Sequence, residues 1–353
     1  MKGIIDLFFK KEKKTLLGID LTTQDIKIVE LTKNSEGKFK IEGYAHHTIP
    51  PGLVSEDIVI DTSQIGQIIK DMVSTNKIHT KDVAISVPQS TVITKTITVT
   101  GDNDREIESE IEMSGKKYLS MDIEEFDFDF KVLYSQAESN NKDVLLIACK
   151  KKIITTRDDT VNIAGLNPTI IDSEAFVYER VYPLISDQVK HELSLKNQEP
   201  NSILMVELFD KKLKVVLLNK GKVSYNEEHP IDFEQKYTQK RFKSLKSTLI
   251  TEEIIDNETL NYRDGVMDTL SRVITIINSE NQSSLTAICF MGDKNNIEKV
   301  KDFIQDNLQI NCLTANPISN MDISNKIDIP DLLEKSSLLV VACGLAMREN
   351  IYD

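Results

Sequence analysis

The chain has 353 residues, enough for about two or three domains. Its formal net charge of −13 argues against a general nucleic-acid binder, because phosphate backbones are bound by clustered Lys and Arg. The cysteines stand far apart, without zinc-ligand spacing, and three of them lie within apolar runs, which indicates free thiols in a reducing cytosol. These cysteines are Cys149, Cys289, Cys312 and Cys343.

The stretch 1–14, MKGIIDLFFKKEKK, combines apolar and basic side chains. Its apolar part is too short for a signal peptide, and no apolar run in the chain reaches the ~20 residues of a transmembrane helix. As a helix, the stretch has an apolar face followed by four lysines, so we expect it to dock on an anionic membrane or on a partner. A passive tail is the alternative. The expected docking residues are Ile4, Ile5, Phe8, Phe9, Lys10 and Lys11.

The first half of the chain has the pattern of an α/β domain. Residues 15–31 predict a strand pair with a tight turn, and 38–48 predict a third strand. The sequence IPPG interrupts the strand pattern, and after it apolar residues at helical spacing predict a helix over 62–75. VAISV at 83–87 is a predicted buried strand, and STVITKTITV is another.

Acidic residues are concentrated in the segment 102–130. Eleven Asp and Glu face three Lys and Arg there, a local net charge of −8. DREIESEIEMSGKKYL suits a helix, FDFDFKVLY alternates as a strand, and DVLLIACKKK predicts a buried strand. We expect a small inserted module over about 101–150, whose carboxylates form a solvated or partner-facing surface rather than an acid/base pair.

The second half begins with the same pattern as the first. The polar stretch 186–200 is the expected linker between a first lobe, 15–185, and a second lobe, 201–353. SILMVELFDKKLKVVLLNKGKV then repeats strand, turn and strand, which predicts an internal duplication. A helical subdomain is expected over about 234–284, and the apolar helix that closes the chain is expected to pack on the first lobe.

Few motifs point to catalysis. The chain contains no GxGxxG, HExxH, GxSxG or CxxC, and its two adjacent histidines, His46 and His47, lack metal-ligand spacing. The first hairpin has the chemistry of a phosphate-binding turn, with backbone N–H groups beside Thr22 and Thr23. Asp20 suits Mg²⁺ or its waters, and Lys27 would offset phosphate charge. Hydroxyl-rich turns are common, so this pattern alone leaves phosphate binding open.

Several segments together resemble the type IV pilus assembly protein PilM family, relatives of FtsA in the actin-like ATPase superfamily. They are LLGIDLTTQDIKIVEL (16–31), DVAISVPQSTVITKTITV (82–99), DVLLIACKKK (143–152), AGLNPTIIDSEAFVYER (164–180) and LLVVACGLAMRE (338–349). The resemblance spans nearly the whole chain. It implies an α/β, actin-like (ribonuclease H-like, duplicated) fold with two lobes around a cleft and a small α+β insertion in the first lobe.

The resemblance also implies a role. The family acts as a cytoplasmic adaptor, peripheral on the inner membrane, that binds the N-terminal cytoplasmic peptide of a PilN-like bitopic membrane protein. It connects that protein to the motor ATPase or platform protein of the pilus, or of a related type II secretion machine, and self-association into a ring is compatible with it. We expect the peptide groove beside the inserted module, where the acidic segment favours basic flanks.

The expected nucleotide loops depart from the family pattern. The first loop usually reads Asp-Ile-Gly-Ser, and here Thr22 stands in place of the glycine that allows close backbone approach. The second usually reads Asp-Ile-Gly-Ala, and here it is Glu207-Leu208-Phe209-Asp210, so that Phe209 and Asp210 are candidates for blocking a phosphate. Residues that would bind a nucleotide, if binding is retained, are Asp20, Leu21, Thr22, Thr23, Lys27, Glu207 and Gly292.

Two functions follow from these observations. The first is an adaptor with a degenerate nucleotide site, without a cofactor and with slow ATP hydrolysis at most. The alternative is a functional actin-like switch in the same machine that binds ATP with Mg²⁺. The eroded loops favour the first, and no catalytic residue or metal site is expected.

Overall fold

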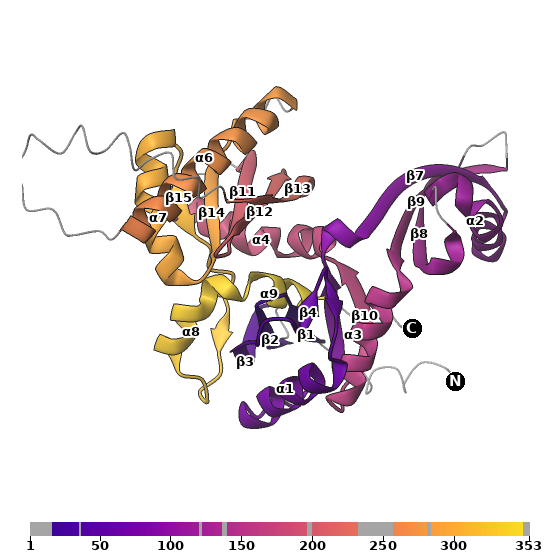
Figure 1. Ribbon diagram of the computed structural model, residues 1–353, viewed down its shortest axis with the longest axis horizontal. Coiled ribbons are helices and arrows are strands. Elements are labelled where there is room, and N and C mark those ends of the chain that lie inside the picture. The colour runs from indigo at the N-terminus through magenta and orange to yellow at the C-terminus, as the bar shows by residue number, and fades with distance from the viewer. Residues whose placement is uncertain are drawn as a thin grey trace, which may run out of the picture. The chain divides into compact units, whose positions relative to one another are not determined.

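The computed structural model describes residues 16–34, 37–119, 122–135, 140–195, 200–231, 257–280 and 284–348 (Figure 1). The expected docking segment 1–14 and residues 234–256 and 281–283 of the expected helical subdomain lie outside these ranges. The chain forms two compact units. The first holds the residues up to Lys33, Glu42–Glu174 and those from Leu345, and the second holds Asn34–Ile41 and Ala175–Gly344.

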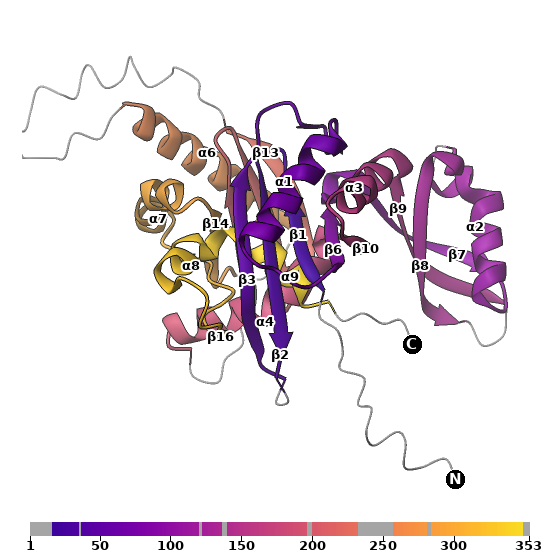
Figure 2. The same ribbon diagram turned by 90° about the horizontal axis from the view of Figure 1, so that it is seen from below.

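The first unit is built on a mixed sheet of strand order β10-β6-β1-β2-β3. β1 and β2 form an antiparallel hairpin, and β1 runs parallel to β6. Every residue of β1 is buried, and the helices α1 and α3 pack against one another over the same apolar core (Figure 2). The elements are β1 (Leu17–Leu21), β2 (Asp25–Lys33), β3 (Phe39–Thr48), β4 (Val54–Ser55), β5 (Ile58–Val59), α1 (Thr62–Thr75), β6 (Asp82–Val87), α3 (Lys151–Ile163) and β10 (Asn167–Ser173).

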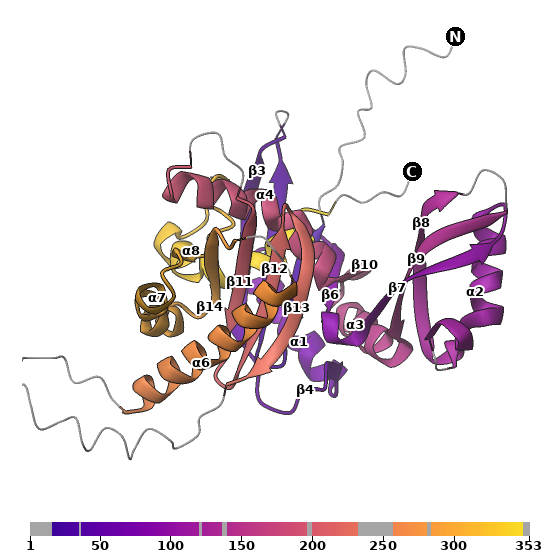
Figure 3. The same ribbon diagram turned by 90° about the horizontal axis from the view of Figure 1, so that it is seen from above.

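The second unit repeats this arrangement. Its sheet has the order β13-β12-β11-β14-β15. β11 is antiparallel to β12 on one side, and β14 and β15 continue the sheet in parallel on its other side. The helix α6 lies beside β13, and it shares an apolar core with α7 and the sheet (Figure 3). The strands are β11 (Ser202–Leu208), β12 (Lys212–Asn219), β13 (Lys222–Pro230), β14 (Ala287–Gly292), β15 (Cys312–Thr314) and β16 (Asp322–Ile323), and the helices are α4 (Glu174–Glu192), α6 (Asn257–Glu280), α7 (Lys294–Leu308), α8 (Ile329–Lys335) and α9 (Val340–Ala346).

The matching strand orders confirm the internal duplication predicted from the two hairpins. Two boundaries differ from those expected. α4 continues through Glu192, because apolar residues at helical spacing such as Ile185 and Val189 are buried, so the first part of the expected linker is helical. β16 pairs in parallel with Lys40 and Ile41 at the start of β3, residues that belong to the second unit.

The insertion in the first unit is a three-stranded sheet with one long helix. The sheet order is β7-β9-β8, and α2 lies along one of its faces (Figure 2). Its elements are β7 (Val92–Thr100), α2 (Asp104–Leu119), β8 (Phe126–Ser135) and β9 (Asn141–Lys150). The module therefore begins at Val92, earlier than the expected boundary near 101, because β7 pairs with β9 along its whole length.

A buried arginine fastens a tight turn to the core of the first unit. Glu56 and Asp57, between β4 and β5, both have a positive φ, which costs energy for residues other than glycine. Arg157 in α3 is fully buried, and its guanidinium donates to the carbonyl of Asp57 and, at 2.9 Å, to that of Ser86. Burial lowers the pKa of Arg157, and nearby carboxylates, Asp57 first, oppose that shift.

We expect Arg157→Lys to destabilise the protein by about 1–3 kcal/mol, because a lysine lacks the planar fork that reaches both carbonyls and leaves one buried acceptor unpaired. Urea unfolding of the full chain measures the change. The exposed Arg105→Lys is the matched control and should stay within about 0.5 kcal/mol of the parent. Equal stability of the two variants would contradict the role given to Arg157.

Candidate functional site

The turn of the first hairpin is closed by its own hydroxyl. The Thr22 amide donates to the carbonyl of Asp25 at 3.0 Å. Its hydroxyl donates to the Asp25 carboxylate at 2.6 Å and accepts from the amides of Gln24 and Asp25 at 3.2 and 3.1 Å. The group expected to face a phosphate is therefore already bonded within the turn. Leu21 is buried in the strand, and Thr23 lies at the tip of the turn.

Lys27 lies buried between two carboxylates. Its ammonium is 3.2 Å from Asp20 and 2.9 Å from Asp25, and its side chain is 1% exposed. The His46 Nε2 lies 3.2 Å from the Asp25 carboxylate. Burial by itself would raise the pKa of Asp25, but Lys27 and the hydrogen bonds from His46 and Thr22 outweigh it and hold that pKa well below its usual range.

Asp20, Thr22 and Lys27 lie together, as expected. They surround Asp25, which was not predicted from the sequence. Asp25 has a recognisable signal, because it stands two residues before Lys27 and therefore on the same side of β2. The positive charge of Lys27 is shared by the two carboxylates of its own hairpin.

The second hairpin carries the same pairing. Lys27 lies directly opposite Asp20 in the register of the first hairpin, and Lys214 lies directly opposite Glu207 in that of the second. All four side chains are buried. The Lys214 ammonium also lies 5.6 Å from the centre of the Tyr178 ring, a distance compatible with a cation–π contact. Lys214 was missed in the sequence, although both acid–lysine pairs are seven residues apart.

Phe209 takes the place of Thr22 in the second turn. Its amide donates to the carbonyl of Lys212 at 3.0 Å, the same closure as in the first turn. The ring is 7% exposed and lies under the Lys212 ammonium, 5.1 Å away, while the Phe209 carbonyl accepts from the Tyr262 hydroxyl at 3.2 Å. Burial raises the pKa of Tyr262, and the nearby carboxylates of Asp210 and Asp293 raise it further.

Gly292 ends β14 with a φ of +112°. A Cβ at this position would lie 2.9 Å from the Leu208 carbonyl oxygen, so the close approach of β14 to β11 by itself requires glycine. Its carbonyl accepts from the Ser337 hydroxyl at 2.8 Å, and Asp293 caps α7 by accepting from two amides. Local packing therefore explains why position 292 is a glycine. The carboxyl ends of β11 and β14 thus bring four of the predicted residues to the same end of the second sheet: Glu207, Phe209, Asp210 and Gly292.

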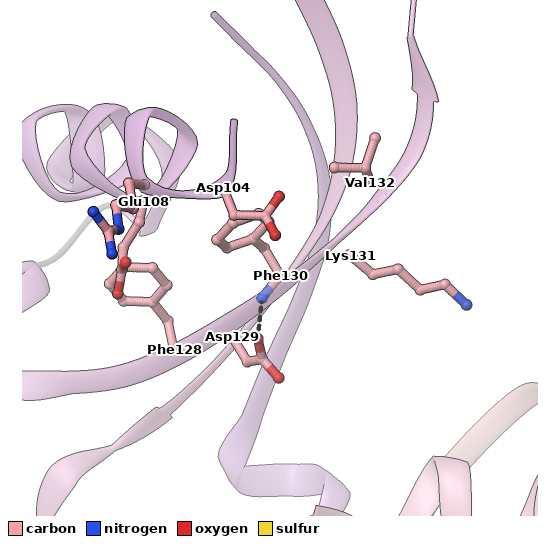
Figure 4. Close-up of a pocket in the computed structure, with 8 residues that line it drawn as sticks. Asp104, Glu108, Phe128, Asp129, Phe130, Lys131 and Val132 are labelled. Carbon is pink, nitrogen blue, oxygen red and sulfur yellow. Dashed lines mark hydrogen bonds between the residues drawn. The ribbon is translucent and has the colours of Figure 1, made fainter. Parts of the chain in front are cut away.

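A groove opens on the inserted module, between the start of α2 and the outer strand β8 (Figure 4). It encloses about 530 Å³. Alternate β8 residues, among them Phe128 and Phe130, pack toward α2, whereas Asp129 and Lys131 lie on the other side of the strand. The lining consists of Asp104, Arg105, Glu108, Phe128, Asp129, Phe130, Lys131 and Val132.

The backbone of β8 contributes to this groove. Among the described strands β8 is the outer one of its sheet, and an outer strand suits the addition of an extended chain. The Phe130 amide donates to the Asp129 carboxylate at 2.8 Å. The groove thus combines an outer strand, two aromatic rings and the carboxylates of Asp104 and Glu108, and Asp129 lines it from the opposite face of β8.

Other expected features lie outside this geometry. The docking residues Ile4, Ile5, Phe8, Phe9, Lys10 and Lys11 belong to the part of the chain that is not described. Within the described residues, no three His, Cys, Asp or Glu side chains gather as metal ligands. No helix in those same ranges is long and apolar enough to cross a membrane.

The low pKa of Asp25 makes stability pH-dependent. A carboxyl whose pKa is lower in the folded state stabilises the fold above its unfolded pKa of ~3.9, and that contribution is lost as the pH falls below it. We expect the parent to lose about 1 kcal/mol more than Asp25→Asn between pH 5 and pH 3. Urea unfolding at both pH values measures the difference.

The control is Asp122→Asn, whose side chain is 71% exposed in the same unit. It should retain the pH dependence of the parent. If Asp25→Asn also retained that dependence, the pairing of Asp25 with Lys27 would not control the carboxyl.

Comparison with known proteins gives a consistent result. The family model described as "Type IV pilus assembly protein PilM" matches residues 18–350. The solved "PilM-PilN type IV pilus biogenesis complex" is 21% identical, with a TM-score of 0.69 over 96% of this chain and 100% of that chain. The ethanolamine utilization protein EutJ from Carboxydothermus hydrogenoformans matches at 13% identity and a TM-score of 0.47, over 95% and 89% of the two chains. The archaeal actin homolog Ta0583 matches at 12% identity and a TM-score of 0.40, over 94% of this chain and 98% of that chain. The chain therefore belongs to the type IV pilus assembly protein PilM family and has its duplicated, actin-like α/β fold.

Proposed function

We propose that this protein is an adaptor of the type IV pilus platform that binds an extended peptide of a PilN-like membrane protein in the groove between α2 and β8. The groove is the observation that carries the proposal. The family assignment supports the pilus role, and the similar solved structure is a complex whose title names PilN.

The chemistry of the groove supports a peptide ligand. β8 can pair with an extended chain, and the rings of Phe128 and Phe130 offer apolar contact. Asp104, Glu108 and Asp129 favour Lys or Arg beside the apolar residues of the ligand, since opposite charges steer association and suppress wrong partners. A volume of about 530 Å³ falls within the usual range of ligand sites.

The same proposal gives the protein a location. A cytoplasmic adaptor that holds the tail of a bitopic membrane protein is peripheral on the inner membrane, and the basic N-terminal segment suits contact with that surface or a partner. From there it would connect the membrane protein to the motor ATPase or platform protein. Ring formation and a type II secretion role are further expectations of the family.

We infer that nucleotide binding is weak or lost. Taken separately, each turn has a poor fit to a phosphate. In the first, the Thr22 hydroxyl and the Lys27 ammonium are already engaged by Asp25 and Asp20. In the second, Phe209 replaces a small residue, Asp210 adds negative charge, and the Gly292 conformation is explained by packing.

Fluorescence anisotropy with labelled cytoplasmic tails of membrane proteins encoded nearby tests the adaptor role. One tail with basic and apolar residues should bind the full chain, and added salt should weaken it. Glu108→Gln should weaken binding about threefold, because an exposed ion pair contributes roughly 0.2–1 kcal/mol.

Glu112→Gln, one turn further along the same exposed face of α2, should leave affinity unchanged. Failure of every such tail to bind folded protein would remove the adaptor proposal. If both Gln variants changed the affinity equally, the peptide would not bind in this groove.

Titration calorimetry with Mg-ATP tests the inference about the nucleotide. We expect no binding in the micromolar range for the parent. Phe209→Gly with Asp210→Ala should improve affinity at least tenfold, about 1.4 kcal/mol, because it removes the ring and the charge from the turn. Micromolar binding by the parent would favour the ATP-dependent switch instead.

A further inference from the structure

The Phe130 amide points away from the paired side of β8. It donates to the Asp129 carboxylate at 2.8 Å, the dashed line in Figure 4. The Phe126 amide also donates away from β9, to the carbonyl of Ile123. Residues of an antiparallel strand alternate between its two sides, so the even-numbered residues of β8 from Phe126 to Val132 direct their backbone groups toward the outer edge.

The Asp129 carboxylate therefore occupies an amide in the middle of this edge. The Asp129 side chain is exposed and lies opposite Ile147 in β9, an apolar residue that offers it no hydrogen bond. An added strand would need the Phe130 amide for one of its own carbonyls, because backbone hydrogen bonds supply much of the affinity in strand addition. The carboxylate competes with that carbonyl.

This bond is not a general consequence of an Asp before a Phe. Asp127 precedes Phe128 in the same strand. Within the described residues, the Phe128 amide makes no corresponding bond to the Asp127 carboxylate. Asp127 is therefore an internal comparison for Asp129.

A second feature limits pairing at the same edge. The pairing of β8 with β9 shifts between Val132 and Tyr134, so Leu133 is an extra residue that interrupts the alternation. Bulges and charged side chains are both common means by which outer strands avoid pairing with other chains. The regular part of the edge, Phe126–Val132, thus ends at a bulge and carries Asp129 at its centre.

We propose that the Asp129 carboxylate blocks strand addition to β8 and that a Lys or Arg of the incoming peptide removes the block. The block is a property of this chain alone, whereas its removal by a membrane protein's tail rests on the proposed function. A cation beside Asp129 forms a charge-assisted pair with the carboxylate and draws it from the Phe130 amide. Asp129 then determines specificity, because an extended chain without a cation meets an occupied edge.

Amide exchange followed by NMR tests the block without any ligand, in the full chain carrying ¹⁵N-labelled phenylalanine. The protection factor of the Phe130 amide should fall at least about threefold in Asp129→Ala, because the hydrogen bond is lost. Asp129→Asn keeps an oxygen acceptor and should retain most of the protection. Asp127→Ala is the matched control and should leave the Phe130 amide unchanged. Equal protection of this amide in the parent and Asp129→Ala would overturn the proposal.

Fluorescence anisotropy tests the removal of the block, with a tail that binds the parent and a second peptide in which Gln replaces each Lys and Arg of that tail. The Gln peptide should bind Asp129→Ala about fivefold more tightly than the parent, because the Phe130 amide is released. It should bind Asp129→Asn and Asp127→Ala as it binds the parent. The unmodified tail should bind Asp129→Asn more weakly than the parent, because the charge is lost and the bond to the amide stays.

The two assays separate this proposal from the adaptor role. If Asp129 only attracted cations, the Gln peptide would bind the parent and both Asp129 variants alike, and the unmodified tail would lose affinity equally for the two variants. That result would overturn the proposal and leave the adaptor role intact. Failure of every tail to bind would remove the adaptor role, and the exchange of the Phe130 amide would still decide whether Asp129 blocks the edge.

Discussion

A buried lysine lies directly opposite a buried carboxylate in the first antiparallel hairpin of each main sheet. Taking an ammonium and a carboxylate out of water is costly unless each finds a partner, and in the first hairpin the Lys27 ammonium lies 3.2 Å from Asp20. Asp20 with Lys27 and Glu207 with Lys214 occupy equivalent positions in two sheets of the same order. In the first hairpin a further carboxylate, Asp25, and the Thr22 hydroxyl complete the cluster. The polar side chains around the first turn are therefore bonded to one another.

The local bonding of the turns supports the inference that nucleotide binding is weak or lost, and the inserted module is then the better candidate for a ligand site. The features that would define a phosphate site are engaged locally, by Asp25 around the first turn and by Phe209 and Tyr262 in the second. The module, by contrast, presents an outer strand with aromatic and acidic side chains, and its chemistry suits an extended, basic and apolar chain. An outer strand with this chemistry supports the proposed adaptor role.

Much of the fold was predictable because strand alternation and turn residues are local signals. The strand pair at 15–31, its repeat near 202–223 and the acidic helix of the module were all visible in the sequence. The boundary near 186 was not, since a polar helix surface resembles a linker until the burial of Ile185 and Val189 is known. The α2/β8 groove was also hidden, because it depends on which strand is outermost, and that follows from the sheet order β7-β9-β8. Asp25 and Lys214 were missed because their importance comes from pairing across a hairpin rather than from a motif.

Hydrogen exchange of the full chain, with and without the cytoplasmic tail of its membrane partner, tests the central claim most directly. Binding in the groove predicts slower exchange along β8, from Phe126 to Tyr134, and around the first turns of α2, with the two hairpin turns unchanged. Protection at the turns beside Thr22 and Phe209, with β8 exchanging as before, would contradict it.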